Sequence, residues 1–183
     1  PVHIGEQLRF VSQRYADEPA LLAYDLLNTD LVDVSTDIRQ QRFVERLENI
    51  ASILRENAPD QLITATLSVN ASITIPVVDF VSFSHVGELE SLRQVIAILR
   101  DATDLPILLS EITYTTFDYD EIGQRQAYFR AFEAIRQNDL AGWVVGAAFD
   151  HPLPLLCELD DSDCDASNDP RARSGLWNTS YFP

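Results

Sequence analysis

The sequence predicts an α/β protein built around a parallel sheet. Short, almost continuous apolar runs alternate with longer segments whose apolar residues recur at helical spacing. Strands that alternate with helices are typical of right-handed βαβ units. Polar side chains follow directly after several of the apolar runs, as they do at the carboxyl ends of parallel strands. The 183 residues are enough for about one domain.

Four segments have the apolar spacing of helices. They run over about residues 6–16, 37–57, 88–102 and 120–137. In the first segment we expect three residues to face inward: Leu8, Val11 and Tyr15. In the last we expect the inward stripe to consist of Ile122, Phe129, Phe132 and Ile135.

Five apolar runs, bounded by Pro, Asp or Gly, predict strands that are buried on both faces. They cover residues 20–27, 62–69, 77–83, 107–109 with their flanks, and 143–149. The predicted order is therefore α-β-α-β-β-α-β-α-β. The connection over residues 70–76 is short for a parallel crossover, so a compressed turn or short helix must take that place.

Composition excludes several classes of function. The chain has 13 Lys and Arg against 29 Asp and Glu, for a formal net charge of -16. This balance excludes nucleic-acid binding, which needs patches of basic side chains. No apolar stretch reaches the ~18 residues of a membrane span. The chain opens with Pro1 and contains no Met, so we expect the native start to lie upstream.

Two cysteines, Cys157 and Cys164, lie close together in an acidic, polar segment. Such a pair predicts a disulfide and hence an exported protein at an extracellular or cell-surface location. The alternative is two unrelated reduced thiols. We read residues 152–175 as a long acidic loop that a short returning segment follows.

Neither a metal nor a cofactor is expected. Asp161, Asp163 and Asp165 have the spacing of a calcium loop, but Ala166 and Ala172 stand where its Gly and its bidentate Glu belong. A solvated acidic loop is the default interpretation. The sequence also lacks the motifs of nucleotide-binding proteins, serine hydrolases and zinc proteases.

The ends of the predicted strands carry the residues best suited to chemistry. Asn28 follows the first strand, His85 the third and Glu111 the fourth. We expect these three side chains to converge at one rim of the sheet, since functional groups of parallel α/β proteins gather at the carboxyl ends of the strands. A rim of acids, an amide, an imidazole and a phenol suits a polyhydroxylated ligand.

Several segments together resemble the cellulase-like retaining glycoside hydrolases, a clan of (β/α)8 barrels. The passage from Arg14 to Asn28 (RYADEPALLAYDLLN) resembles the stretch that leads into their fourth strand. Residues 78–85 (VDFVSFSH) look like the sixth strand, and residues 142–150 (GWVVGAAFD) like the eighth. Residues 105–116 (LPILLSEITYTT) look like the seventh strand, which carries the nucleophilic Glu. Residues 175–178 (GLWN) are similar to the segment that often follows the eighth strand.

The resemblance implies a partial TIM (β/α)8 barrel that holds strands four to eight, with the first three strands absent from this chain. Residues 1–183 would form a single partial barrel domain, with the acidic loop at 152–175. A full barrel needs ~250 residues. We therefore expect the N-terminal part of the same barrel to be the partner of this chain; the alternative is a reduced fold in which the sheet closes differently.

The resemblance also implies roles for individual residues. Glu111 takes the position of the nucleophile, Asn28 that of the contact to the sugar's 2-hydroxyl, and His85 and Tyr114 shape the adjacent subsite. Thr29 stands where the acid/base Glu is expected, so Asp30 is the candidate for a displaced acid/base. Phe149, followed by Asp150, replaces the usual Trp platform on the eighth strand. Retaining hydrolysis uses two carboxyl groups roughly 5–5.5 Å apart, so the change at Thr29 bears directly on activity.

Each of these residues also has a purely structural interpretation. Glu111 is otherwise a surface or salt-bridged acid, His85 and Tyr114 are otherwise core residues, and Asn28 and Asp30 otherwise form turns or caps. The function predicted is that of a glycoside hydrolase-like domain acting on or binding β-linked carbohydrate. The alternatives are a catalytically inactive barrel that binds carbohydrate or is a structural, cell-surface protein, and an unrelated α/β protein.

Overall fold

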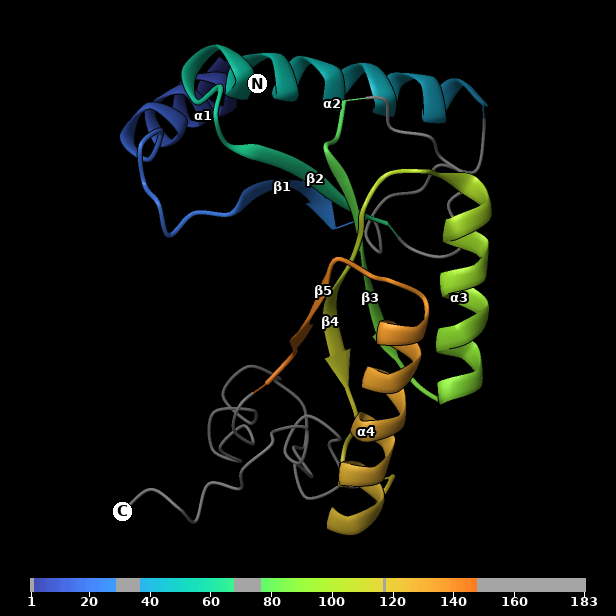
Figure 1. Ribbon diagram of the computed structural model, residues 1–183. Coiled ribbons are helices and arrows are strands. Elements are labelled where there is room, and N and C mark those ends of the chain that lie inside the picture. The colour runs from blue at the N-terminus through green and yellow to red at the C-terminus, as the bar shows by residue number, and fades with distance from the viewer. Residues whose placement is uncertain (1, 29–36, 68–76, 117, 148–183) are drawn as a thin grey trace, which may run out of the picture. The chain divides into compact units, whose positions relative to one another are not determined.

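The computed structural model describes residues 2–28, 37–67, 77–116 and 118–147. Helices and strands follow one another in the predicted order, as Figure 1 shows: α1 (Val2–Arg14), β1 (Ala23–Asn28), α2 (Asp37–Asn57), β2 (Leu62–Leu67), β3 (Phe80–Val86), α3 (Leu89–Ala102), β4 (Ile107–Thr113), α4 (Glu121–Gln137) and β5 (Gly142–Val145). The strands form one sheet in the order β1-β2-β3-β4-β5. The predicted α/β class is therefore confirmed.

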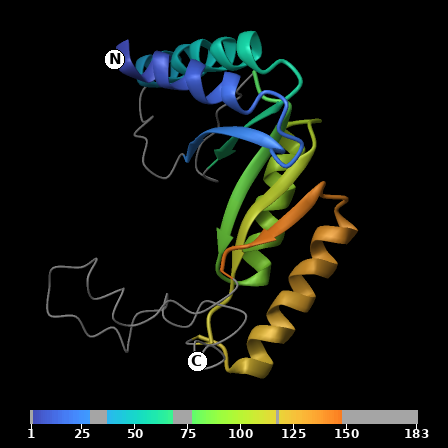
Figure 2. The ribbon, with the colours of Figure 1, turned by 90° about the vertical axis from the view of Figure 1, so that its left-hand side faces the viewer.

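The chain divides into two compact units, which we describe separately. The first comprises Pro1–Phe83 with Ala102–Leu108, and the second Ser84–Asp101 with Leu109–Pro183. In the first unit α1 and α2 lie side by side (Figures 1 and 2). Its buried side chains include Leu47, Leu54, Ile63 and Ala65, and those of the second unit include Leu92, Ile96, Leu109 and Ile112. No helix among the described residues is long and apolar enough to cross a membrane.

The bounds of several strands differ from the prediction. Strands β1 and β3 each begin three residues later than predicted, β3 ends at Val86, β4 continues to Thr113, and β5 ends at Val145. His85 and Glu111 therefore lie inside strands rather than after them. The apolar run marks where a strand is buried, whereas the backbone ladder continues through polar residues, because its hydrogen bonds come from main-chain groups.

The end of β1 contains a bulge. Asp25 lies opposite Thr64 of the parallel neighbour β2, yet Asn28 lies opposite Thr66, so three steps on β1 match two on β2. The Asp25 carboxylate accepts hydrogen bonds from the Thr66 backbone N–H, at 3.0 Å, and from the Thr66 hydroxyl. The carboxylate thus accepts hydrogen bonds at the point where the bulge interrupts the backbone hydrogen bonding between β1 and β2. Bulges of this kind change the direction of the residues that follow them.

The predicted inward faces of two helices were wrong in part. In α1 the buried residue is Ser12, whereas Val11 is 41% exposed and Tyr15, just beyond the helix, is 47% exposed. The Ser12 hydroxyl donates to the Leu8 carbonyl at 2.7 Å, so burial leaves no donor unsatisfied. Gln13 donates from Nε2 to Asn57 Oδ1 of α2 at 2.7 Å, which identifies the side that faces α2. A small side chain such as Ser12 permits close approach between helices.

In α4 half of the predicted stripe lies outside, since Ile122 is 62% exposed and Phe129 is 70% exposed, whereas Ile135 is 3% exposed and Phe132 is half-buried. Besides Ile135 and two alanines, the buried side carries polar residues that find partners at the end of β4. Gln124 donates from Nε2 to the Tyr114 carbonyl at 2.7 Å, and the Tyr128 hydroxyl accepts from the Tyr114 N–H at 3.2 Å. A count of apolar positions does not reveal such pairing, because buried polar groups are stable once they are hydrogen-bonded.

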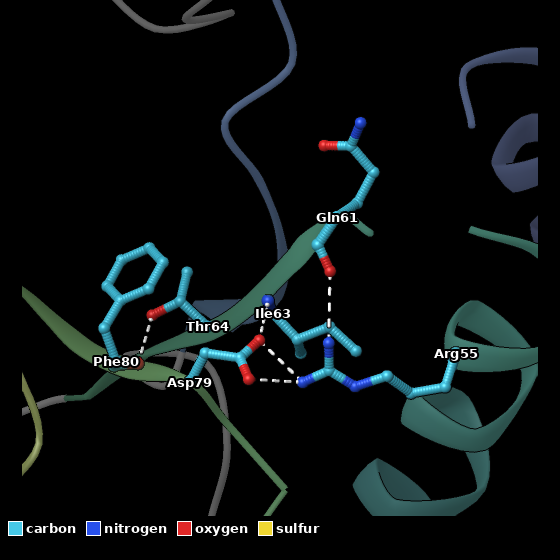
Figure 3. Close-up of polar contacts among 6 residues, drawn as sticks. All are labelled: Arg55, Gln61, Ile63, Thr64, Asp79 and Phe80. Atoms are coloured by element: carbon cyan, nitrogen blue, oxygen red, sulfur yellow. Dashed lines mark hydrogen bonds and ion pairs between the residues drawn. The ribbon is translucent and has the colours of Figure 1, made fainter. Parts of the chain in front are cut away.

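An ion pair joins α2 to the start of β3, as Figure 3 shows. Arg55 donates to both carboxylate oxygens of Asp79 at 2.6 Å, and also to the Gln61 carbonyl at 3.1 Å. Asp79 in turn accepts from the Ile63 backbone N–H at 2.7 Å. Charge-assisted bonds of this geometry are about twice as strong as neutral ones. The pair therefore fixes the starts of β2 and β3 against the end of α2.

We expect Asp79→Asn to lower the free energy of unfolding by about 1–3 kcal/mol, because hydrogen bonds to charged groups contribute on that scale. The matched control is Glu90→Gln, whose partner Arg93 lies 3.8 Å away on the exposed side of α3; its effect should stay within about 0.5 kcal/mol. Urea unfolding of both variants measures the difference. Equal effects would show that the Asp79 pair does not support the fold.

Candidate functional site

Glu111 is an exposed carboxylate on a strand whose other side chains are buried or partly buried. Ile107, Leu109 and Ile112 are 0% exposed, so buried side chains lie on both faces of β4. Glu111 comes two residues after Leu109 and therefore lies on the same face, nearer the end of the strand. Its side chain is exposed there, as an acid that contacts a ligand requires.

Gly146, just after β5, lies directly against this carboxylate. Its N–H donates to the Ile112 carbonyl at 3.0 Å. A Cβ at Gly146 would lie 2.4 Å from Thr113 Oγ1, 2.7 Å from Glu111 Oε1 and 2.9 Å from Glu111 Cγ. These separations are closer than carbon atoms approach in proteins, so only glycine fits beside Glu111 in its present position.

The Glu111 carboxylate lies on the face of the sheet that points away from α4. Trp143 of β5 stacks on Phe132 of α4, with ring centroids 4.0 Å apart and planes inclined by 20°. Side chains alternate between the two faces of a strand. Gly146 comes three residues after Trp143, and its N–H still bonds to β4 at the Ile112 carbonyl, so the alternation continues as far as this residue. Because Gly146 faces Glu111 and Thr113, these two side chains lie opposite the helix-covered face.

His85 is 6% exposed and lies near the end of β3. Its Nε2 is 3.2 Å from the Glu88 carbonyl oxygen, a distance at which a protonated Nε2 donates to it. Burial lowers the pKa of this imidazole, against the opposing effect of hydrogen bonds to the Glu88 and Gly87 backbone. The side chain is therefore held neutral and fixed to the turn that follows β3.

The lowered pKa of His85 predicts a dependence of stability on pH. The unfolded imidazole binds a proton first, at about pH 6.5, so the contribution of the neutral His85 is lost as the pH falls through that region. We expect the stability difference between the native protein and His85→Gln to shrink between about pH 7.5 and pH 5. Urea unfolding at the two pH values measures it. A difference that stays constant would mean that another group causes the acid sensitivity.

Tyr114 follows β4 and is 2% exposed. Its ring meets those of Tyr119 and Tyr128 edge to face, with centroids 5.7 and 5.1 Å away. Burial, together with the neighbouring Tyr119 and Tyr128, raises the pKa of Tyr114 to about 12. Its hydroxyl has no hydrogen-bond partner among the described residues. The side chain thus supports the end of β4 from within.

The remaining predicted site residues lie partly or wholly outside the described residues. These are Thr29, Asp30, Phe149, Asp150 and the cysteines Cys157 and Cys164; for Asn28 only the backbone is described. The convergence of Asn28, His85 and Glu111 therefore stays a prediction. What the sequence interpretation missed is the pair Thr113 and Gly146. The signal for Gly146 was present, because an isolated Gly in a strand pattern indicates a close backbone approach.

Solved structures with the same arrangement of elements are glycoside hydrolases and related proteins. A β-glucuronidase from an uncultured Clostridium species superposes with a TM-score of 0.71 at 14% identity, covering 97% of this chain and 32% of that one. The cellulose synthase subunit Z of Clostridioides difficile gives a TM-score of 0.61 at 15% identity, covering 77% and 58%. Endo-glycoceramidase II from a Rhodococcus species gives 0.55 at 20% identity, covering 82% and 41%.

At these identities the likeness concerns the fold alone. No protein-family model matches the chain, and no curated protein matches it in sequence. The chain spans between 32% and 58% of the lengths of the three structures compared. The predicted resemblance is confirmed at the level of the fold: the chain has the architecture of part of the (β/α)8 barrel of cellulase-like glycoside hydrolases.

Proposed function

We propose that this chain is a glycoside hydrolase-like domain that acts on β-linked carbohydrate, with Glu111 as the nucleophile. The observation that carries this proposal is an exposed carboxylate on an otherwise buried strand of a barrel fold. That carboxylate lies against Gly146 on the face opposite α4. The inner faces and strand ends of such barrels are where catalytic groups lie.

In the proposed reaction a Glu111 carboxylate oxygen attacks the anomeric carbon, and the bond from that carbon to the leaving oxygen breaks. The product is a glycosyl ester of Glu111. Water then attacks the same carbon, and the carboxylate is released. Asn28 would hold the sugar's 2-hydroxyl, while His85, Tyr114, Phe149 and Asp150 would shape the subsite around the ring.

The site lacks the usual residue that donates a proton to the leaving group. Thr29, at the position of the acid/base Glu, cannot act as an acid near neutral pH. Asp30, one residue later, is the proposed donor. A leaving group that is already a stable anion needs no proton, so we expect activated aryl glycosides to react far faster than natural linkages.

The remaining strands of a complete barrel would supply the other residues that surround the site. Val144 of β5 is 50% exposed, and Trp143 is 45% exposed. The short span relative to the compared structures supports a partner that supplies further strands, namely another part of the same barrel. An extracellular or cell-surface location with a Cys157–Cys164 disulfide completes the proposal.

The second candidate function is a catalytically inactive barrel that binds carbohydrate or is structural. Thr29 favours it, because removal of a general acid/base costs roughly 10²–10⁴-fold in rate. Binding of sugar without turnover is the property that distinguishes this candidate from the enzyme.

Covalent trapping tests the proposal. The full chain is incubated with a dinitrophenyl β-glucoside whose 2-hydroxyl is replaced by fluorine, which slows release of the glycosyl ester. We expect one equivalent of dinitrophenolate and a mass increase on the peptide that contains Glu111. An adduct on another residue would overturn the role of Glu111, and sugar binding without any adduct would establish the inactive barrel instead.

A further inference from the structure

A hollow of about 360 Å³ opens where β3 and β4 end, within the second unit. Its volume is at the lower end of the range of small-molecule sites, ~300–1,000 Å³. The polar and aromatic residues that line it are Glu88, Thr113, Tyr114, Thr115, Asp118 and Tyr119. The hollow is thus sized for a small ligand or one unit of a larger one.

The lining is rich in hydrogen-bond acceptors. Glu88 and Asp118 are both exposed carboxylates, which accept hydrogen bonds and donate none when ionised. Asp118 is held in place by Thr115, whose hydroxyl donates to Asp118 Oδ2 at 2.9 Å and accepts from the Asp118 N–H at 3.1 Å. Thr113 and the half-buried ring of Tyr119 complete this side. Carboxylates beside an aromatic ring suit a ligand with several hydroxyl donors and an apolar ring face.

The same lining is unsuited to an anion. None of the residues that line the hollow in the described part of the chain is Lys, Arg or His. A carboxylate on the ligand would meet Glu88 and Asp118 without a cation to pair with. The net charge of -16 acts in the same direction.

We propose that this hollow is a subsite for an uncharged pyranose residue and that it excludes uronic acids. Thr113 lines the hollow and comes two residues after Glu111 on β4, although Glu111 and Gly146 are not among the lining residues. The hollow therefore lies at the carboxyl end of the strand that carries Glu111. Its assignment to a sugar rests on the proposed function, whereas the discrimination by charge rests on the lining itself.

A matched pair of ligands tests the proposal. Methyl β-glucoside and methyl β-glucuronide differ only in a hydroxymethyl group against a carboxylate. Binding of each to the isotope-labelled full chain is followed by NMR at low salt. We expect the glucoside to shift the signals of residues 86–88 and 113–119 and to bind roughly 3–10-fold more tightly, as two partly exposed like-charge pairs imply. The ratio should fall at high salt, which screens such charges.

Variants of Glu88 and Asp118 test whether these carboxylates cause the preference for the uncharged sugar. Glu88→Gln and Asp118→Asn should each lower the glucoside-to-glucuronide ratio, whereas Glu90→Gln, an exposed acid that does not line the hollow, should not change it. Equal binding of the two ligands, tighter binding of the glucuronide, or no binding of either at high millimolar concentration would overturn the proposal. Signal shifts confined to other residues would do the same.

The binding assay separates this inference from the proposed function, because it needs no turnover. If the protein prefers the glucoside over the glucuronide but forms no glycosyl adduct, only the proposed catalysis is contradicted. If it forms the adduct but binds both ligands equally, only the proposed subsite is contradicted.

Discussion

Glu111→Gln is expected to lower kcat for a dinitrophenyl β-glucoside by at least about 10³-fold, on the scale of losing a catalytic group. The amide keeps the size and much of the hydrogen bonding of the carboxylate, yet it is a poor nucleophile toward the anomeric carbon. Because Glu111 is exposed, the substitution buries no unsatisfied group, and the fold should persist. Steady-state kinetics of the full chain measure the loss, with the binding of methyl β-glucoside as a check that the site is intact.

The matched control is Glu90→Gln, which removes an exposed carboxylate from α3 in the same unit and should leave kcat unchanged. Azide provides a second readout. It attacks the glycosyl ester without needing a general base, so it should accelerate release in Asp30→Asn, where the proposed base is absent, and should have no effect in Glu111→Gln. Turnover that survives Glu111→Gln would remove Glu111 from the mechanism.

The order of the elements was predictable because it depends on local pattern. The segment 37–57 has helical spacing and coincides with α2 (Asp37–Asn57). Apolar runs bounded by Pro or Asp located the strands, since a strand buried on both faces has few polar residues. The inner faces of α1 and α4 were predictable only in part, since Ile135 is buried as expected whereas Val11, Ile122 and Phe129 are exposed. Gln124 and Tyr128 lie on the buried side of α4 and form hydrogen bonds with the end of β4, and no count of apolar positions contains those bonds.

In the candidate site, too, the sequence predicts local features but not those that depend on tertiary packing. The sequence places Glu111 after an apolar run, and the structure adds that its side chain is exposed although Leu109 before it and Ile112 after it are buried. Exposure of this kind depends on how neighbouring strands pack, which a single strand does not encode. The close approach of Gly146 to Glu111 and Thr113 likewise joins two strands that the α4 segment separates in the sequence.

That close approach leads to the second large effect. We expect Gly146→Ala to lower kcat by roughly 10²-fold, the scale of displacing a catalytic group by about 1 Å. The new Cβ would lie 2.7 Å from Glu111 Oε1 and 2.4 Å from Thr113 Oγ1, so both side chains must move. The clashing atoms belong to side chains rather than to the backbone, so the fold should persist and circular dichroism should change little. Thr113 is β-branched and stiff at χ1, so the unfolding midpoint should fall modestly. The flexible Glu111 side chain moves more easily, and its carboxylate is displaced.

The control is Gly5→Ala, whose Cβ would meet its neighbours at ordinary distances, 3.8 Å from Arg9 and 3.9 Å from Ile53. Two double variants show whether Gly146 acts through Glu111. Gly146→Ala should cost nothing further in a Glu111→Gln background, since the nucleophile is already absent. Adding Thr113→Ala should restore part of the rate, because it removes the tightest clash and gives Glu111 room to return. If Gly146→Ala lowers kcat equally with and without Glu111, the glycine acts on the strand as a whole, and the carboxylate does not owe its position to it.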